Sequence, residues 1–263
     1  MITLLKSEIE KYSTQEERIH HLRESLQILI LKIIYDRGFF KNLSFVGGTA
    51  LRILYDLKRF SEDLDFSLIQ KKGFDFTKFS QDLKKQLKLY GLTVETNEKR
   101  EANVKSSMLK FPEILYSLGL SPLKSQKLFV RVEVDTNPQA GWRNEVSLVN
   151  KIYLFSVTHF DLPSLFATKI HACFFRRYVK GRDFYDLVWY LTRKVTPNFQ
   201  LLNNAIAQTE KKRPNLKEEN LKGFLKEYLG KVNFNKVRKD VQRFLVNKDE
   251  LKLLEKGLIL KLL

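Results

Sequence analysis

The stretch FVGGTALRILYDLKRFSEDLDFSL, residues 45–68, carries two adjacent glycines near its start and two aspartates, one residue apart, near its end. Apolar residues before the glycines predict a short buried strand over 43–47. The spacing of apolar residues after the glycines predicts a helix over 49–57, and a second strand is predicted over 63–68. One short segment thus joins a strand, a glycine turn, a helix and a strand that bears paired carboxylates.

Gly47 and Gly48 lie where the first strand meets the helix. Glycine lets the backbone approach a ligand closely and adopt angles that other residues avoid. Amide groups of such a turn and of the helix N-terminus suit phosphate oxygens, and Thr49 adds a hydroxyl at the same place. Two glycines also occur in many tight turns that bind nothing, so this pair alone leaves both interpretations open.

Asp63 and Asp65 are predicted to point to the same face of their strand, because alternate strand residues share a face. Two adjacent carboxylates repel each other unless a cation lies between them. Hard oxygen donors of this kind suit Mg²⁺ or Mn²⁺. The alternative is a pair of solvent-facing aspartates at the end of a strand.

Arg59 and Ser61 come just before the aspartates and are predicted to contact the same phosphates. A glycine turn for triphosphate oxygens and carboxylates for one or two metal ions form the layout of nucleotidyl transfer. In that reaction a metal orients the α-phosphate and stabilises charge on the attacking and leaving oxygens.

A second informative stretch is LFATKIHACFFRRYVKGRDFYDLVWYL, residues 165–191. On one helix, positions i+7 and i+11 fall within roughly 20° of position i, so Lys169, Arg176 and Lys180 are predicted to form a cationic stripe. Such a stripe would bind phosphates, and a solvated helix face is the alternative.

Gly181 is predicted to break this helix, so that Asp183 begins or caps the next one. In an unbroken helix, Lys169 and Asp183 would lie roughly 21 Å apart. The two side chains meet only if the chain turns at Lys180–Gly181.

The two stretches together resemble the AbiEii-type nucleotidyltransferases, which include toxins of the AbiE phage-defence systems and the related MenT-type toxins. The resemblance implies a polymerase-β-like nucleotidyltransferase fold, a divalent metal and an NTP donor. In the MenT branch it implies tRNA, extended at its 3′ end, as acceptor. Carried over by residue, the phosphate-holding motif matches Gly47, Gly48 and Thr49, the metal and active-site motif matches Ser61, Asp63 and Asp65, and the later active-site positions match Lys169 and Asp183, with Arg182 beside them.

A third acid is predicted on the strand FVRVEVDTN, residues 129–137, where it would act as general base toward the attacking hydroxyl. Arg131, Glu133 and Asp135 share one face of this strand. We favour Glu133, which lies deeper in the strand, but sequence reasoning leaves Asp135 open as third acid and metal ligand.

The rest of the chain predicts an α+β protein in two parts: residues 1–157, a mixed-sheet nucleotidyltransferase domain with N-terminal helices, and residues 158–263, a helical domain. Thr14 and Glu17 form a predicted capping box within the N-terminal helices. The further predicted helices are 3–38, 76–90, 161–179, 183–193, 198–211, 216–229 and 234–262, and the further strands are 92–97, 104–111, 127–135 and 151–155.

The amino-acid composition indicates which binding partners and which cellular compartment to expect. The 263 residues carry a formal net charge of +17, which favours anionic partners such as nucleic acid or nucleotides. A single cysteine, Cys173, excludes an internal disulfide, and no apolar run reaches the length of a membrane span. We therefore expect a cytoplasmic protein.

The leading hypothesis is a metal-dependent toxin that transfers nucleotides from NTP to RNA, at the tRNA 3′ end, and so blocks translation. The resemblance also implies a cognate antitoxin protein as partner. Two alternatives stay open: a basic RNA-binding module without catalysis, and a nucleotidyltransferase with a protein or small-molecule acceptor.

Overall fold

The computed structural model describes residues 1–211 and 214–263. The chain groups into two compact units. Unit 1 comprises Met1–Ala50, Ser61–Pro138 and Val146–His159, and unit 2 comprises Leu51–Phe60, Gln139–Glu145 and Phe160–Leu263. Two short segments, 51–60 and 139–145, thus group with the C-terminal helices, and the predicted domain division at 157/158 stays a prediction.

Within the described residues, one seven-stranded sheet has the strand order β3-β4-β5-β2-β1-β7-β6. The sheet is mixed, because β2 pairs in parallel with β5 and antiparallel with β1. This agrees with the predicted α+β fold class. The strands are β1 (Leu43–Val46), β2 (Asp63–Leu68), β3 (Glu95–Arg100), β4 (Val104–Phe111), β5 (Leu128–Asp135), β6 (Asn144–Asn150) and β7 (Leu154–Phe160).

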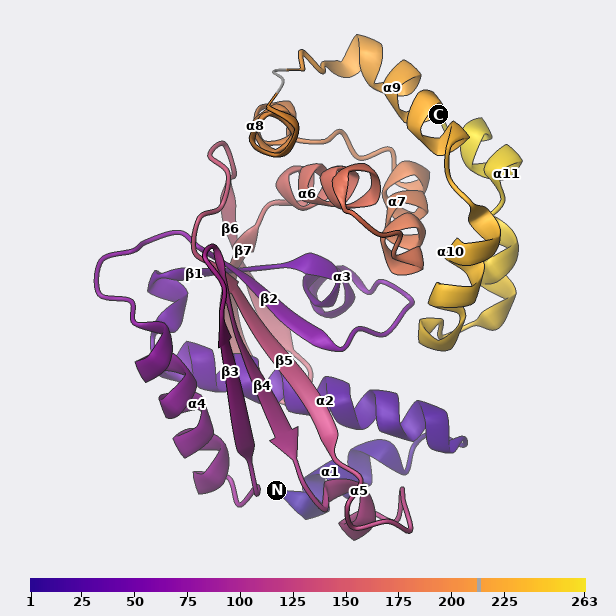
Figure 1. Ribbon diagram of the computed structural model, residues 1–263. Coiled ribbons are helices and arrows are strands. Elements are labelled where there is room, and N and C mark those ends of the chain that lie inside the picture. The colour runs from indigo at the N-terminus through magenta and orange to yellow at the C-terminus, as the bar shows by residue number, and fades with distance from the viewer. Residues whose placement is uncertain (212–213) are drawn as a thin grey trace. The chain divides into compact units, whose positions relative to one another are not determined.

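Helices α2 and α4 cover one face of the sheet in unit 1 (Figure 1). Ser80 of α4 hydrogen-bonds Ser107 of β4 across 2.9 Å, which identifies the covered face of β4. The predicted capping box is confirmed at the start of α2, where Thr14 and Glu17 exchange hydrogen bonds. The helices of unit 1 are α1 (Ile2–Ile9), α2 (Gln15–Asp36), the 3₁₀ turn Phe39–Lys41, the first turn of α3 (Gly47–Tyr55), α4 (Phe76–Leu89) and α5 (Ile114–Ser117).

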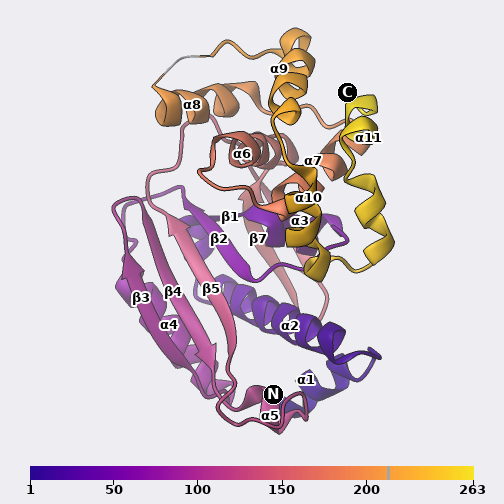
Figure 2. The same ribbon diagram turned by 45° about the vertical axis from the view of Figure 1, so that its right-hand side comes forward.

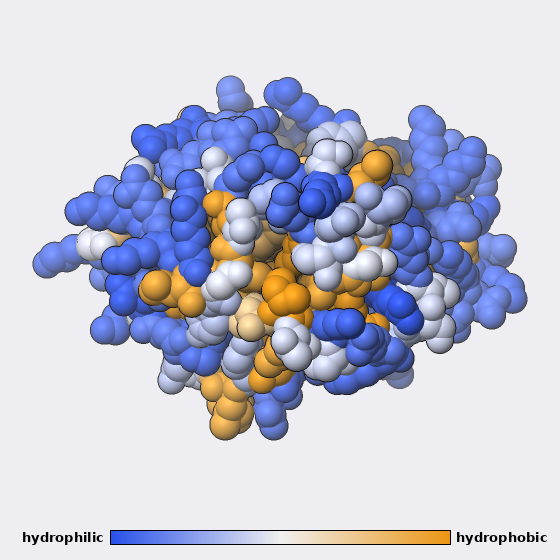
Figure 3. Space-filling model, turned by 90° about the horizontal axis from the view of Figure 1, so that it is seen from below, coloured by the Kyte–Doolittle hydropathy of each residue, from blue (hydrophilic) through white to orange (hydrophobic). Residues whose placement is uncertain are grey.

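Apolar residues gather at the end of unit 1 that carries α1 and α5, the face shown in Figure 3. Exposed apolar side chains there include Ile2, Leu4 and Tyr116. Figure 1 places the start of α3 at the other end of the unit, so this apolar face is remote from the glycine turn.

Unit 2 is helical. Its helices are the remainder of α3, α6 (Leu162–Phe175), α7 (Gly181–Thr192), α8 (Phe199–Glu210), α9 (Glu218–Gly230), α10 (Phe234–Val241), the 3₁₀ turns Gln242–Phe244 and Lys248–Leu253, and α11 (Lys256–Lys261). Within the described part of the chain, no helix combines the length and the apolar character that a membrane span needs.

Several predicted boundaries are wrong. The helix predicted over 161–179 ends at Phe175, the strand predicted over 92–97 lies at 95–100, and β6 was not predicted. The helix predicted over 234–262 is broken because Phe60 donates its backbone N–H to Phe244, and Val246 donates to Lys58. These hydrogen bonds hold the chain near 245 extended, which a helix does not allow.

Candidate active site

Position 47, at the start of α3, requires glycine for two reasons. Gly47 has a φ of +79°, which L side chains rarely adopt. A Cβ built on Gly47 would also overlap Oδ2 of the Asp65 carboxylate. The start of α3 therefore lies closer to Asp65 than any residue with a side chain permits.

Thr49 does not point its hydroxyl at a ligand site. The residue is buried, and its hydroxyl donates a hydrogen bond to the backbone carbonyl of Asp63. Thr49 therefore ties α3 to the start of β2. Gly48, also buried, follows Gly47 in the first turn of α3.

The predicted carboxylates meet an arginine and a third acid on neighbouring strands. In the parallel pairing of β2 with β5, Asp63 lies opposite Arg131, and Asp65 lies opposite Glu133. Arg131 Nη1 lies 3.3 Å from Glu133 Oε1, and Arg131 Nε lies 3.8 Å from Asp63 Oδ1. These four residues form what we call the carboxylate face, and their side chains alternate with buried apolar residues along both strands. The predicted sharing of one strand face is therefore confirmed.

The register also separates the two candidates for the third acid. Glu133 pairs with Asp65, whereas Asp135 pairs with Ser67, one strand repeat further on. Asp135 accepts a hydrogen bond from the backbone N–H of Asn137 at 2.9 Å, as a turn cap does, and burial raises the pKa of its carboxyl. This placement favours Glu133 as the third acid and leaves Asp135 outside the proposed metal ligands.

The donor set fits a hard divalent cation that substrate completes. Mg²⁺ is commonly held by one or two carboxylates together with substrate phosphates. Asp63 and Asp65 supply two half-buried carboxylates on one face of β2. A cation held there would take its remaining ligands from phosphate and water oxygens, as Mg²⁺ commonly does. Among the described residues, no group of three or more His, Cys, Asp or Glu could hold a metal ion.

Unit 2 contains a second charged cluster, which we call the buried ion network. Lys169 of α6 contacts Asp183 at 2.7 Å and Asp186 at 2.8 Å, both on α7. The chain turns between Phe175 and Gly181, which is the condition set by the sequence for Lys169 and Asp183 to meet. Arg176 Nη1 completes the cluster with a contact of 2.6 Å to Asp183.

The electrostatics of this network keep its members charged. Burial raises the pKa of Asp183, but Lys169 and Arg176 lower it by more, so the pKa lies below its ordinary value. Burial lowers the pKa of Lys169, but Asp183 and Asp186 outweigh burial and raise it above the ordinary value. Both shifts describe an ammonium and a carboxylate held together as ions.

Arg59 belongs to the same network. Its Nε and Nη2 donate to the two carboxylate oxygens of Asp186 at 2.6 and 2.5 Å, and the exposed side-chain fractions are 2% and 0%. A guanidinium so enclosed does not reach a triphosphate in solvent. The structure therefore argues against the predicted phosphate contact of Arg59 and gives it a structural partner.

Other predicted residues have plain structural positions. Lys180 precedes α7 as its N-cap, so the stripe of Lys169, Arg176 and Lys180 on one helix is wrong. The carboxylate of Asp183 contacts Lys169 and Arg176, and within the described residues the N-cap of α7 makes no side-chain capping hydrogen bond. The guanidinium of Arg182 stacks over Phe244, 4.1 Å from the ring centroid. Ser61 is half-buried, and its carbonyl accepts a hydrogen bond from Gln27 at 3.1 Å.

The sequence alone indicates no role for Asp186 or Arg131 in the site. Asp186 lies three residues after Asp183, and this spacing places the two on one helix face, which was the available signal. Arg131 shares a strand face with Glu133, but only the β2–β5 register shows that it lies opposite Asp63. The contacts of Asp186 with Lys169 and of Arg131 with Asp63 depend on the fold and cannot be predicted from the local sequence.

A glycine turn followed by strand-borne carboxylates on a mixed sheet is the arrangement that the sequence predicted for a nucleotidyltransferase. The chain belongs to the AbiEii family, because residues 29–257 match the family described as the nucleotidyl transferase AbiEii toxin of type IV toxin–antitoxin systems.

Solved structures support the fold. The Helicobacter pylori protein JHP933 is similar with a TM-score of 0.51 and 20% identity over 91% of this chain and 89% of that chain. A second H. pylori protein, whose description as a nucleotidyltransferase is provisional, has a TM-score of 0.51 and 19% identity over 91% of this chain and 92% of its own. No curated protein matches the sequence.

Proposed function

We propose that this chain is a toxin that transfers a nucleotide from NTP to the 3′ end of an RNA, with tRNA as the acceptor. The observation that carries the proposal is the strand register that places Asp63 and Asp65 opposite Arg131 and Glu133, with Gly47 against Asp65. Family membership supports nucleotidyl transfer. The net charge of +17 favours RNA over a small acceptor.

In this proposal the acceptor hydroxyl attacks the α-phosphorus of the NTP, the new phosphodiester bond forms, and pyrophosphate leaves. Glu133 accepts the proton of the attacking hydroxyl. Backbone amides at the start of α3 bind phosphate oxygens, and Gly47 allows their close approach. When bound at Asp63 and Asp65, a divalent cation supplies charge stabilisation for the transferred phosphoryl group.

Lys169 and Asp183 enter the proposal as a positioning pair. Both are buried, and their observed contacts are to each other, to Asp186 and to Arg176. Their proposed contribution is to fix the geometry of α6 and α7. Contacts of Ser61 and Arg182 with substrate stay predictions from the resemblance.

Blocked translation and neutralisation by an antitoxin follow from the family and belong to the same proposal. A tRNA whose 3′ end carries added nucleotides no longer offers the end that is aminoacylated. Growth of cells that express the chain, with wild-type and Asp65→Ala forms compared, tests the toxin role separately from the chemistry.

The direct test is incorporation of label. The protein is incubated with total bacterial RNA, Mg²⁺ and each α-labelled NTP in turn, and Asp65→Ala is the control. The proposal predicts label in a tRNA-sized band that the variant does not produce. Absence of label with all four NTPs, and with Mn²⁺ in place of Mg²⁺, would remove the RNA-acceptor mechanism.

A further inference from the structure

The face of β3, β4 and β5 opposite α4 continues the carboxylate face. The strand registers place Phe129 beside Lys110, Arg131 beside Met108, and Glu133 beside Ser106. Figure 2 shows β3, β4 and β5 with α2 and α4 behind them, and no described helix of unit 1 in front.

Phe129 is the chief exposed aromatic residue of this surface. It lies near the start of β5, and 42% of the residue is exposed. Its strand neighbours of the covered face, Leu128 and Val130, are buried. A phenylalanine turned to solvent while its neighbours fill the core offers a flat apolar surface that folding does not use.

Two cations adjoin this ring, and the carboxylate of Glu95 on β3 lies across from one of them, Lys110. Lys110 is the cross-strand partner of Phe129, and Arg131 is the next residue on the same face of β5. On β3, Lys99 pairs with Ser106, so it shares the same face. Phe129, Lys110, Arg131 and Lys99 form what we call the sheet platform.

This combination fits single-stranded nucleic acid. Aromatic side chains on a sheet stack bases without sequence preference, and neighbouring cations bind the phosphates. A folded duplex hides its base faces, so it would not use Phe129. Phe129 and Arg131 lie on the same face of β5. They offer a stacking surface and then a cation to successive nucleotides of a single-stranded RNA.

The platform is aligned with the carboxylate face. Glu133 lies four positions after Phe129 on β5, which corresponds to about 13 Å along an extended strand. A few nucleotides cover that distance. An RNA end that stacks a base on Phe129 and follows β5 would bring its terminal hydroxyl to Glu133.

We infer that the sheet platform binds the single-stranded 3′ end of the acceptor RNA, with a base on Phe129 and phosphates on Lys110 and Arg131. This inference rests on the proposed function, because it names the acceptor surface of the same site.

The test is binding without catalysis. A fluorescein-labelled single-stranded RNA of ten nucleotides is titrated with the protein, without NTP or divalent metal, and fluorescence anisotropy reports Kd. Phe129→Ala is expected to weaken binding roughly 10-fold or more, as loss of one base–aromatic stack does. Phe129→Trp is expected to keep binding. Lys110→Glu is expected to weaken binding and to flatten its dependence on salt.

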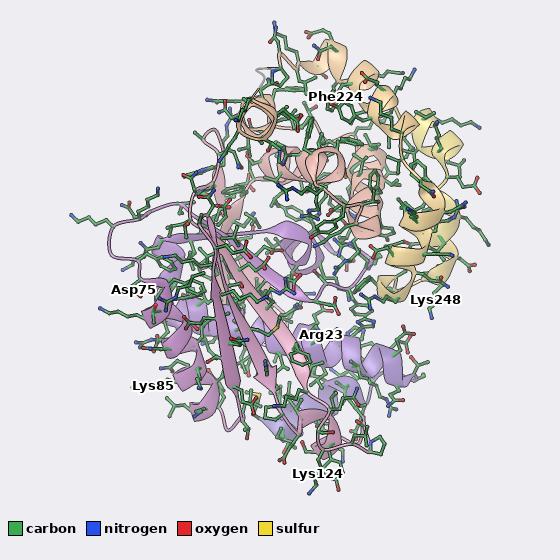
Figure 4. The ribbon with its side chains drawn as sticks, viewed as in Figure 1. Arg23, Asp75, Lys85, Lys124, Phe224 and Lys248 are labelled. Atoms are coloured by element: carbon green, nitrogen blue, oxygen red, sulfur yellow. The ribbon has the colours of Figure 1, made fainter. Side chains whose placement is uncertain are left out.

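Two matched controls belong to the experiment. Tyr116→Ala removes an aromatic residue of similar exposure, 44%, from α5, and Lys85→Glu makes the same charge change on α4, on the opposite side of the sheet (Figure 4). Both are expected to bind as wild type. Equal weakening by Phe129→Ala and Tyr116→Ala, or no weakening by Phe129→Ala, would overturn the inference.

The outcomes separate the inference from the proposed function. RNA labelling by the wild type together with unchanged binding of Phe129→Ala rejects the platform and leaves the function. Platform-dependent binding with no labelling of any RNA rejects the function and leaves an RNA-binding surface. Size-exclusion chromatography in which Phe129→Ala converts a dimer to a monomer, with RNA binding unchanged, would assign the face to a second copy of the chain and overturn the inference.

Discussion

In unit 1, Asp63 and Glu133 lie half-buried on an open sheet face beside Arg131, whereas in unit 2 Asp186 and Arg59 are withdrawn from solvent. The carboxylate face and the buried ion network both pair acidic with basic side chains, but the difference in burial gives the two clusters different roles. A partly exposed ion pair is weak and can exchange partners with a substrate. A buried pair loses several kcal/mol if one partner is removed, so it holds structure.

The largest expected effect is on catalysis at the carboxylate face. Glu133→Gln is expected to slow nucleotidyl transfer about 100- to 10,000-fold, because it removes the proposed general base. Asp135→Asn, two residues further along β5, is the matched control and is expected to keep most activity. Single-turnover incorporation of labelled NTP measures both. A larger loss in Asp135→Asn would reassign the third acid.

Next in size is the stability of the buried ion network. Asp186→Ala leaves Arg59 and Lys169 buried without that carboxylate, and we expect a loss of about 3–5 kcal/mol in the free energy of unfolding. Asp249→Ala breaks a 3.2 Å pair with Lys252 on the surface and is expected to change stability by less than about 1 kcal/mol. Urea denaturation of the two variants and of wild type measures these losses. Equal free energies of unfolding for Asp186→Ala and Asp249→Ala would show that the buried ion network does not stabilise the fold.

The sequence predicted the elements around the site better than the contacts inside it. Strand β2 occupies the residues that the sequence predicts, because apolar Leu64, Phe66 and Leu68 alternate with polar residues. The sequence predicts a phosphate contact for Arg59 because it lies just before the aspartates, but its partner Asp186 lies 127 residues away. Such a contact depends on the packing of α7 and leaves no local pattern.

Missed elements have similar causes. Strand β6 exposes Val146 and Leu148 and buries the adjacent Val149, so its apolar residues do not mark one buried face. The long C-terminal helix was predicted from apolar spacing that continues through Leu245, where backbone bonds to the segment before Ser61 interrupt it. Tertiary hydrogen bonds override local helical preference at that point.

A smaller effect is expected at the glycine turn. Gly47→Ala and Gly91→Ala both place a side chain on a backbone with φ near +80°, but only the Cβ at residue 47 would overlap Asp65. We expect Gly91→Ala to cost about 1–2 kcal/mol and Gly47→Ala to cost more. Gly47→Ala should also lower nucleotidyl transfer, because Asp65 must shift. Thermal unfolding and incorporation assays of both variants give the difference, and identical behaviour would contradict the close approach.

The smallest effect concerns pH. The pKa of Asp183 is lowered in the folded state, so its ion pairs add stability that is complete above the ordinary pKa near 4 and is lost as the pH falls through the lowered value. Arg176→Gln removes one cause of that shift and is expected to cost about 1–2 kcal/mol at neutral pH. In urea titrations, the gap to wild type should begin to narrow below about pH 4 and should close once the pH is below the lowered pKa of Asp183. A gap that persists in acid would show that Arg176 stabilises by packing alone.

We expect the carboxylate face to carry out the chemistry and the buried ion network to stabilise the fold. The most direct measurement compares Asp65→Asn with wild type for incorporation of α-labelled NTP into RNA, with circular dichroism and unfolding recorded on the same samples. We expect a folded variant of near wild-type stability that transfers no label. Transfer at the wild-type rate by a folded Asp65→Asn protein would contradict it.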